Sequence, residues 1–134
     1  MYGTYFEDFI KSGDSLNVYH GDRLIFSSSE KMLLPLLQYI KEYASRCQDV
    51  VVMDKIVGRA AAMLLVKACC YEVFSPLASE RALEILDRHK ILHYFSRVVP
   101  VILKPGTEEI CPMEKLSSGM DDAEEFYNTV KDLV

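Results

Sequence analysis

The side chains best suited to binding or catalysis begin where an apolar run, Val50–Met53, ends. Asp54 and Lys55 follow that run directly, and Gly58 and Arg59 stand in front of a helical segment. Backbone N–H groups at the start of a helix bind anions, and the planar guanidinium of arginine suits phosphate or carboxylate. This arrangement predicts an anion site at Gly58 and Arg59, with Asp54 and Lys55 in contact with the ligand.

Each of these residues also has a purely structural interpretation. Gly58 could serve only the turn, beside an Arg59 on the surface, and Asp54 and Lys55 could pair with each other. The chain has no Gly-x-x-x-x-Gly-Lys-Ser/Thr phosphate loop, so a nucleoside triphosphatase is not expected.

Ser79 and Glu80 open a further helical segment and form a second candidate group for ligand binding. Their simpler interpretation is a serine N-cap followed by a carboxylate that the helix dipole stabilises. As ligand-binding residues they rank below Gly58.

Cys111-Pro112-Met113-Glu114 forms a third group, in which a thiol stands directly before a proline that could begin a helix. The helix dipole could lower the pKa of that thiol and make it a nucleophile, with Glu80 or Glu114 in acid–base roles. Because no base is adjacent in the sequence, a buried structural cysteine is the competing interpretation.

No metal or other cofactor is predicted. His89 and His93 have the i, i+4 spacing of a paired metal site, but no third ligand is in pattern with them. The four cysteines lack the spacing of a zinc site or a disulfide framework, which indicates free thiols in a reducing compartment. They are Cys47, Cys69, Cys70 and Cys111.

Hydrophobic patterns predict the elements that position these groups. Gly21-Asp22 suits a tight hairpin turn, and Pro35 suits the first turn of a helix. The expected helices are 2–10, 35–46, 59–68, one beginning at Ser79-Glu80, and 121–133; the expected strands are 16–20, 23–27, 50–53, 71–74 and 98–103.

Repeated strand–helix units predict a three-layer α/β/α fold, with a mostly parallel sheet and an N-terminal antiparallel hairpin. Ligand sites of such sheets lie at the carboxyl ends of the strands. Asp54–Arg59, Phe74–Glu80 and the loop after Leu103 should therefore meet at one edge.

Length and composition predict a single domain, residues 1–134, in the cytoplasm. The apolar runs are too short to cross a bilayer, and Glu7 and Asp8 stand where a signal peptide would be basic and then apolar. With 20 acidic and 15 basic residues, the net charge of −5 argues against a long nucleic acid as a partner.

The order of these elements is similar to the cytidine deaminase fold. In that family, one helix carries a zinc-ligating His or Cys close to a catalytic Glu, and the next opens with Pro-Cys-x-x-Cys. This chain has Val57–Ala61 at the first place and Pro76–Glu80 at the second, so Leu77 and Glu80 replace the two thiolates. The resemblance therefore implies the fold without zinc and without deaminase chemistry.

Three stretches, 54–62, 79–86 and 110–114, resemble the uncharacterised family catalogued as domain of unknown function 1893, which is assigned the same fold. The resemblance covers most of the chain from Ser27 onward. It departs at Arg59, where lysine is more usual, and at Lys104-Pro105, where Asn-Arg is more usual. It implies a fold but no particular activity.

Three functions remain open from the sequence. The preferred one is binding of a small anionic or nucleotide-like molecule, and Arg59→Ala should then abolish stabilisation by that ligand. The second is a metal-independent enzyme with Cys111 as its nucleophile. The third is a homo-oligomeric scaffold in which aromatic side chains of the first helix dock on a neighbouring subunit. The ligand-binding residues would be Asp54, Lys55, Gly58, Arg59, Ser79 and Glu80, and the docking residues Tyr2, Tyr5, Phe6 and Phe9.

Overall fold

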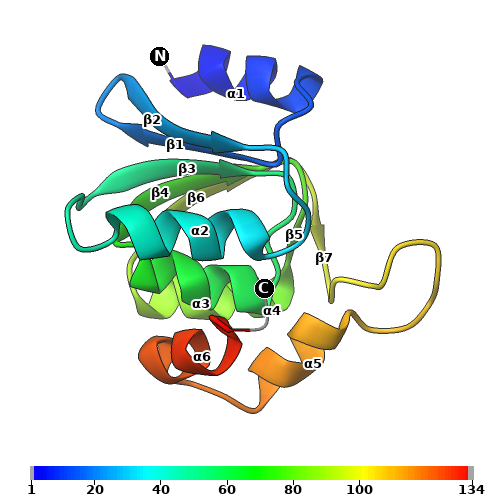
Figure 1. The fold of residues 1–134 in the computed structure, drawn as a ribbon. Helices are drawn as coiled ribbons and strands as arrows, with labels where there is room; N and C mark the ends of the chain where they lie inside the picture. Colours follow the sequence, from blue (N-terminus) through cyan, green and yellow to red (C-terminus); the bar gives the residue numbers. More distant parts are fainter. Residues whose placement is uncertain (1, 133–134) are drawn as a thin grey trace.

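Short β-favouring runs form a five-stranded sheet in the computed structural model, which describes residues 2–132 (Figure 1). The strand order is β2-β1-β3-β4-β6. Strand β1 pairs antiparallel with both β2 and β3, whereas β3–β4 and β4–β6 are parallel. The sheet is therefore mixed, and the prediction of a mostly parallel sheet is wrong. The strands are β1 Leu16–His20, β2 Arg23–Ser28, β3 Val50–Asp54, β4 Cys70–Ser75 and β6 Leu92–Phe95.

The region predicted as a strand at 98–103 is different in the structure. The edge strand that pairs with β4 is β6, which precedes that region. Only Val98–Val99 (β7) is a strand there, and it pairs in parallel with Ala78–Ser79 (β5) in a separate two-stranded sheet. Pro100 follows β7 directly, and its lack of a backbone N–H prevents it from donating to a ladder.

Helices cover both faces of the main sheet (Figure 1). Helix α1 lies on one face, and α2, α3 and α4 lie on the other. Helices α5 and α6 pack against α3 on the side away from the sheet. The bounds are α1 Tyr2–Lys11, α2 Leu34–Tyr43, α3 Arg59–Lys67, α4 Glu80–Arg88, α5 Pro112–Ser118 and α6 Ala123–Val130. Leu133, the predicted end of the last helix, lies outside the described residues.

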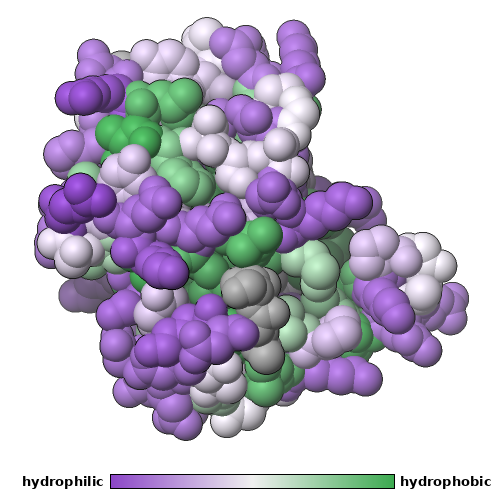
Figure 2. Space-filling view, in the orientation of Figure 1, coloured by the Kyte–Doolittle hydropathy of each residue, from purple (hydrophilic) through white to green (hydrophobic). Residues whose placement is uncertain are grey.

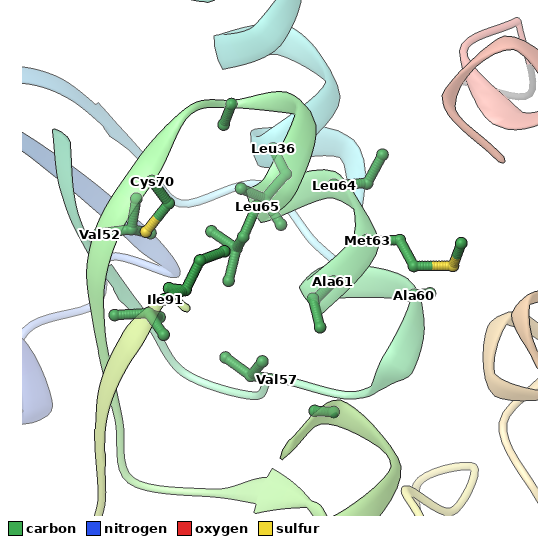
Figure 3. Close-up of a cluster of buried hydrophobic side chains, with 14 of the residues drawn as sticks. Leu36, Val52, Val57, Ala60, Ala61, Met63, Leu64, Leu65, Cys70 and Ile91 are labelled. Atoms are coloured by element: carbon green, nitrogen blue, oxygen red, sulfur yellow. The ribbon is translucent and has the colours of Figure 1, made fainter. Parts of the chain in front are cut away.

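Helix α3 lies at the centre of the core because its small side chains permit close approach to the sheet. Residues Ala60–Leu65 are all buried, and they pack with Val52 of β3 and Leu36 of α2 (Figure 3). Burial on both faces of β3 explains its unbroken apolar run, since Val50, Val51, Val52 and Met53 are at most 4% exposed.

The aromatic side chains of α1 pack on the sheet of their own chain. Phe6 and Phe9 are buried with Tyr19, Val51 and Met53. The Tyr5 and Tyr19 rings stack with centroids 4.8 Å apart. The side chains that the scaffold prediction assigned to a neighbouring subunit are thus used within the chain.

Within residues 2–132, no helix combines the length and the apolar character that crossing a membrane requires. All four cysteines are free thiols.

Candidate functional site

A pocket of about 430 Å³ opens at the carboxyl end of β3. Its walls come from the loop before α2, the first turn of α3 and the segment that leads into α5. Figure 2 shows apolar surface in the region between α2 and α5, flanked by hydrophilic side chains. The pocket lies at the edge where the strand order predicts a ligand site.

Most of the site residues predicted from the sequence line this pocket. Asp54, Lys55, Gly58, Cys111 and Glu114 all line it, although they come from two segments more than 50 residues apart. Three other predicted residues, Arg59, Ser79 and Glu80, do not line it.

Glu114, a residue of α5, binds the backbone at the N-terminal end of α3. Its carboxylate accepts hydrogen bonds from the backbone N–H of Arg59 and, at 3.2 Å, from the backbone N–H of Ile102. The side chain is buried, with 2% exposed. The helix-start N–H group that was predicted to bind an external anion therefore has a carboxylate of the same chain as its partner.

Gly58 is explained by the approach of that carboxylate. A Cβ atom at Gly58 would lie 2.5 Å from Glu114 Oε1 and 3.1 Å from Ile102 Cγ1. The backbone of Gly58 is in the extended region, with φ −93°, so conformational freedom is not the reason for a glycine here. The glycine makes room for the side chain that caps the helix.

The Arg59 guanidinium points away from the pocket and ties α5 to α3. Nε donates to the Ser117 carbonyl oxygen at 2.9 Å, and Nη2 donates to Met120 O at 2.8 Å and to Asp121 at 3.0 Å. Arg59 is 6% exposed rather than a surface residue. Its donors satisfy the buried Ser117 carbonyl and the partly buried Met120 carbonyl, so its role in this geometry is to hold the α5 wall in position.

Ser79 has the structural role proposed for it. Its hydroxyl accepts a hydrogen bond from the Ala82 N–H at 3.1 Å, which makes it the N-cap of α4. The side chain is fully buried, whereas Glu80 is exposed to solvent outside the pocket.

Lys55 and Asp54 do not pair with each other. The Lys55 ammonium donates to the Ser12 carbonyl oxygen at 2.9 Å and lies 4.7 Å from the centre of the Phe9 ring. Asp54 forms no ion pair with any of the described residues. Burial raises the pKa of Asp54 to about 7, although backbone hydrogen bonds from Ile56 and Lys55 act in the opposite direction. Asp54 is therefore a carboxyl group without a cationic partner in the described part of the chain.

The apolar rim of the pocket was not predicted from the sequence. Met32, Ile56 and Leu103 line the pocket, yet their side chains are 75%, 47% and 43% exposed. Met32 also has φ +59°, a conformation that is uncommon outside glycine and asparagine. The Ser15 hydroxyl lies 2.6 Å from the Glu30 carbonyl oxygen and 3.0 Å from that of Ser28, so its single hydrogen is donated within this loop and holds it in place. An exposed apolar side chain has no signature in the sequence.

Residues 2–132 contain no group of three or more His, Cys, Asp or Glu side chains that could hold a metal ion. His93 Nε2 lies 3.2 Å from Asp87 Oδ1 on the surface.

Comparison with known proteins gives matches over almost the whole chain. A family model described as TM1506, domain of unknown function (DUF1893), matches residues 6–134. A crystal structure of a DUF1893 family protein (TM1506) from Thermotoga maritima is 29% identical, with a TM-score of 0.89, and the match covers 99% of this chain and 89% of that chain. No curated protein matches the chain.

Proposed function

Since the chain belongs to the DUF1893 family, a domain of unknown function, we propose its function from the site itself: it binds a small molecule in the pocket at the carboxyl end of β3. The observation that carries this proposal is an apolar pocket that contains a half-buried carboxyl group, Asp54, with no cationic partner among residues 2–132. Ligand pockets are typically apolar cavities of about 300–1,000 Å³ with a few polar groups that orient the ligand. The volume of about 430 Å³ suits a molecule of nucleoside size.

The pocket gives less support to an anionic ligand than to a nucleotide-like one. Three carboxylate residues, Glu30, Asp54 and Glu114, line the pocket with Lys31 and Lys55. Of these two lysines, Lys55 directs its ammonium to Ser12. A heterocycle with an apolar surface fits these walls better than a phosphate.

The cytidine-deaminase-like fold is also part of this proposal. The order of a hairpin, a buried strand, a helix, another strand and a further helix entered through a proline supports it. Leu77 and Glu80 stand where the family has thiolates, so we propose no zinc chemistry. Four free thiols suit a reducing compartment and support a cytoplasmic location.

A thermal-shift screen of nucleosides, nucleotides, amines and small anions tests the proposal. A ligand at 100 times its Kd stabilises the folded state by ~2.7 kcal/mol, which raises Tm by several degrees in a domain of this size. We expect at least one class to raise Tm in the wild type. Ala61→Met should remove that shift, because Ala61 lines the pocket and a longer side chain at this position reduces its volume. Ala61 is also buried in the core, so the Tm of this variant without ligand verifies that the fold is kept.

Ala123→Met is the matched control, since Ala123 is half-buried at the start of α6 and outside this pocket. It should leave the ligand-induced shift unchanged. A shift that survives Ala61→Met would place binding elsewhere, and no shift across the panel would remove the proposal.

A second candidate function is suggested by the position of Cys111. The thiol is half-buried and lines the same pocket as Asp54, a carboxyl group that could accept its proton. Glu80 lies outside the pocket and the Glu114 carboxylate is engaged at α3, so neither supplies the base proposed from the sequence. Nucleophilic catalysis would therefore use Asp54.

Iodoacetamide labelling followed by peptide mass spectrometry tests this candidate. A functional Cys111 should react faster than Cys47, which is also half-buried but lies outside the pocket. Cys70 should react slowest, because burial raises the pKa of its thiol. Labelling of Cys111 at or below the rate of Cys47 would eliminate the enzyme hypothesis.

A further inference from the structure

We infer that the ligand of this pocket is a small organic cation, an amidinium or ammonium group on an apolar or aromatic body, with its charged end at Asp54. This inference rests on the proposed function and specifies the chemical class that the pocket selects. It differs from the anionic class expected from the sequence.

The first observation is the state of Asp54. It lies at the end of β3, where its carboxylate has only backbone N–H groups as partners within the described residues, and the Ile56 N–H is a long 3.4 Å from Oδ1. No lysine, arginine or histidine of residues 2–132 lies within ion-pair distance. Asp54 is half-buried at the pocket wall, so its carboxylate has lost part of its hydration without gaining an ion pair and is open to a cation from outside the chain.

The second observation is that two cationic groups near the pocket, those of Lys55 and Arg59, already have partners in the chain. The Lys55 ammonium is bound to Ser12 and lies over Phe9. The Arg59 guanidinium is bound to Ser117, Met120 and Asp121. To pair with Lys55 or Arg59, an anion entering the pocket would have to compete with these contacts, which leaves the exposed Lys31 as the pocket lysine without such a contact.

The third observation is the charge that each wall contributes to the pocket. The loop before α2 contributes Glu30 and Lys31, which carry opposite charges, and β3 is followed by Lys55. The α5 segment contributes Cys111 and Glu114, of which Glu114 is bound to backbone N–H groups. The whole chain carries a net charge of −5, which also favours approach of a cation.

The fourth observation is the apolar rim formed by Met32, Ile56 and Leu103. These side chains are partly exposed to solvent around the pocket. Covering them with an aromatic or aliphatic body would remove apolar surface from water and favour binding. A methionine is well suited to this contact because its side chain adapts to the shape of its partner.

Binding of such a cation depends on pH in a direction that the structure determines. A cation binds the ionised form of Asp54, whose pKa in the free protein is about 7. At pH 6 about a tenth of the groups are ionised, and at pH 8 about nine tenths are ionised. The affinity should therefore rise about tenfold from pH 6 to pH 8, and binding below pH 7 should release a proton.

Benzamidine, benzamide and benzoate test the inference, because they share one ring and differ in the charge of the substituent. Calorimetry at pH 6 and pH 8 should show benzamidine binding at least about tenfold more tightly than either analogue at pH 8, since a tenfold change in affinity is the effect of one charge-assisted contact. Asp54→Asn should remove this preference and the pH dependence. Asp22→Asn, at the exposed hairpin turn, is the matched control and should change neither.

Asp54→Asn is expected to keep the fold, because burial already disfavours the charged form of Asp54, and its Tm without ligand verifies this. Tighter binding of benzamide or benzoate, blocked by Ala61→Met, would overturn the inference while the pocket proposal stands. A second outcome would also overturn the inference alone. In it none of the three compounds binds, but another ligand of the thermal-shift screen does, and Ala61→Met removes its binding. Failure of both panels would remove the inference and the pocket proposal together.

Discussion

Glu114→Ala is expected to lower the free energy of unfolding by about 3–5 kcal/mol. The substitution removes two hydrogen bonds to a buried carboxylate, each worth about 1.5–3 kcal/mol. It also leaves the backbone N–H groups of Arg59 and Ile102 without their partner at the start of α3. Few single substitutions cost this much, and those that do break buried networks of this kind.

Urea unfolding followed by circular dichroism measures the effect. Glu108→Ala, in the exposed segment before α5, is the matched control and should change stability by less than about 0.5 kcal/mol. The cost of Glu114→Gln should fall between those of Glu114→Ala and Glu108→Ala. The glutamine amide keeps one oxygen that accepts a hydrogen bond, but its NH₂ group faces the second backbone N–H, which is also a donor. A cost for Glu114→Ala no larger than that of the control would show that this carboxylate does not support α3.

Gly58→Ala is expected to cost about 2–3 kcal/mol, the range seen when extra atoms are forced into packed interiors. The added Cβ would lie 2.5 Å from Glu114 Oε1 and 3.0 Å from Glu114 Cδ. Glu114 can move toward the pocket only by giving up its hydrogen bonds with Arg59 and Ile102. The clash must therefore break these hydrogen bonds or displace α5 or the start of α3.

A double-mutant cycle in urea distinguishes this steric cause from a general effect of glycine replacement. In the Glu114→Ala background the atoms that clash are absent, so Gly58→Ala should cost less than about 1 kcal/mol. The coupling energy should then exceed about 1 kcal/mol, as for residues in direct contact. Additive costs would instead point to the backbone of Gly58, and the proposed contact with Glu114 would lose its support.

Sequence patterns alone predicted the elements that depend on neighbours in the chain. The Gly21-Asp22 hairpin, the buried strand β3 and the N-cap Ser79 all follow from residues within a few positions of each other. These signals are local because a turn, a cap or a buried strand is determined by backbone geometry and by the side chains beside it. For the same reason Asp54 could be placed at a strand end, where the pocket lies.

Local signals were weaker for the edge of the sheet. Residues Val98–Leu103 have the composition of a strand, yet the sheet ends with β6, Leu92–Phe95. Strand β4 pairs with β6, where Glu72 lies opposite Leu92, and it does not pair with residues 98–103. Such pairing is settled by packing between segments far apart in the sequence.

Only the tertiary structure decided the chemistry of the site. Arg59 and Gly58 carry the pattern of an anion site, but Glu114, 55 residues from Arg59, supplies the anion from within the chain. The same packing sends Arg59 to Ser117 and leaves Asp54 without a cation among the described residues. The sequence determined which groups can bind charge. The fold determined which of them are satisfied, because burial forces each polar group to find a partner wherever the chain brings one.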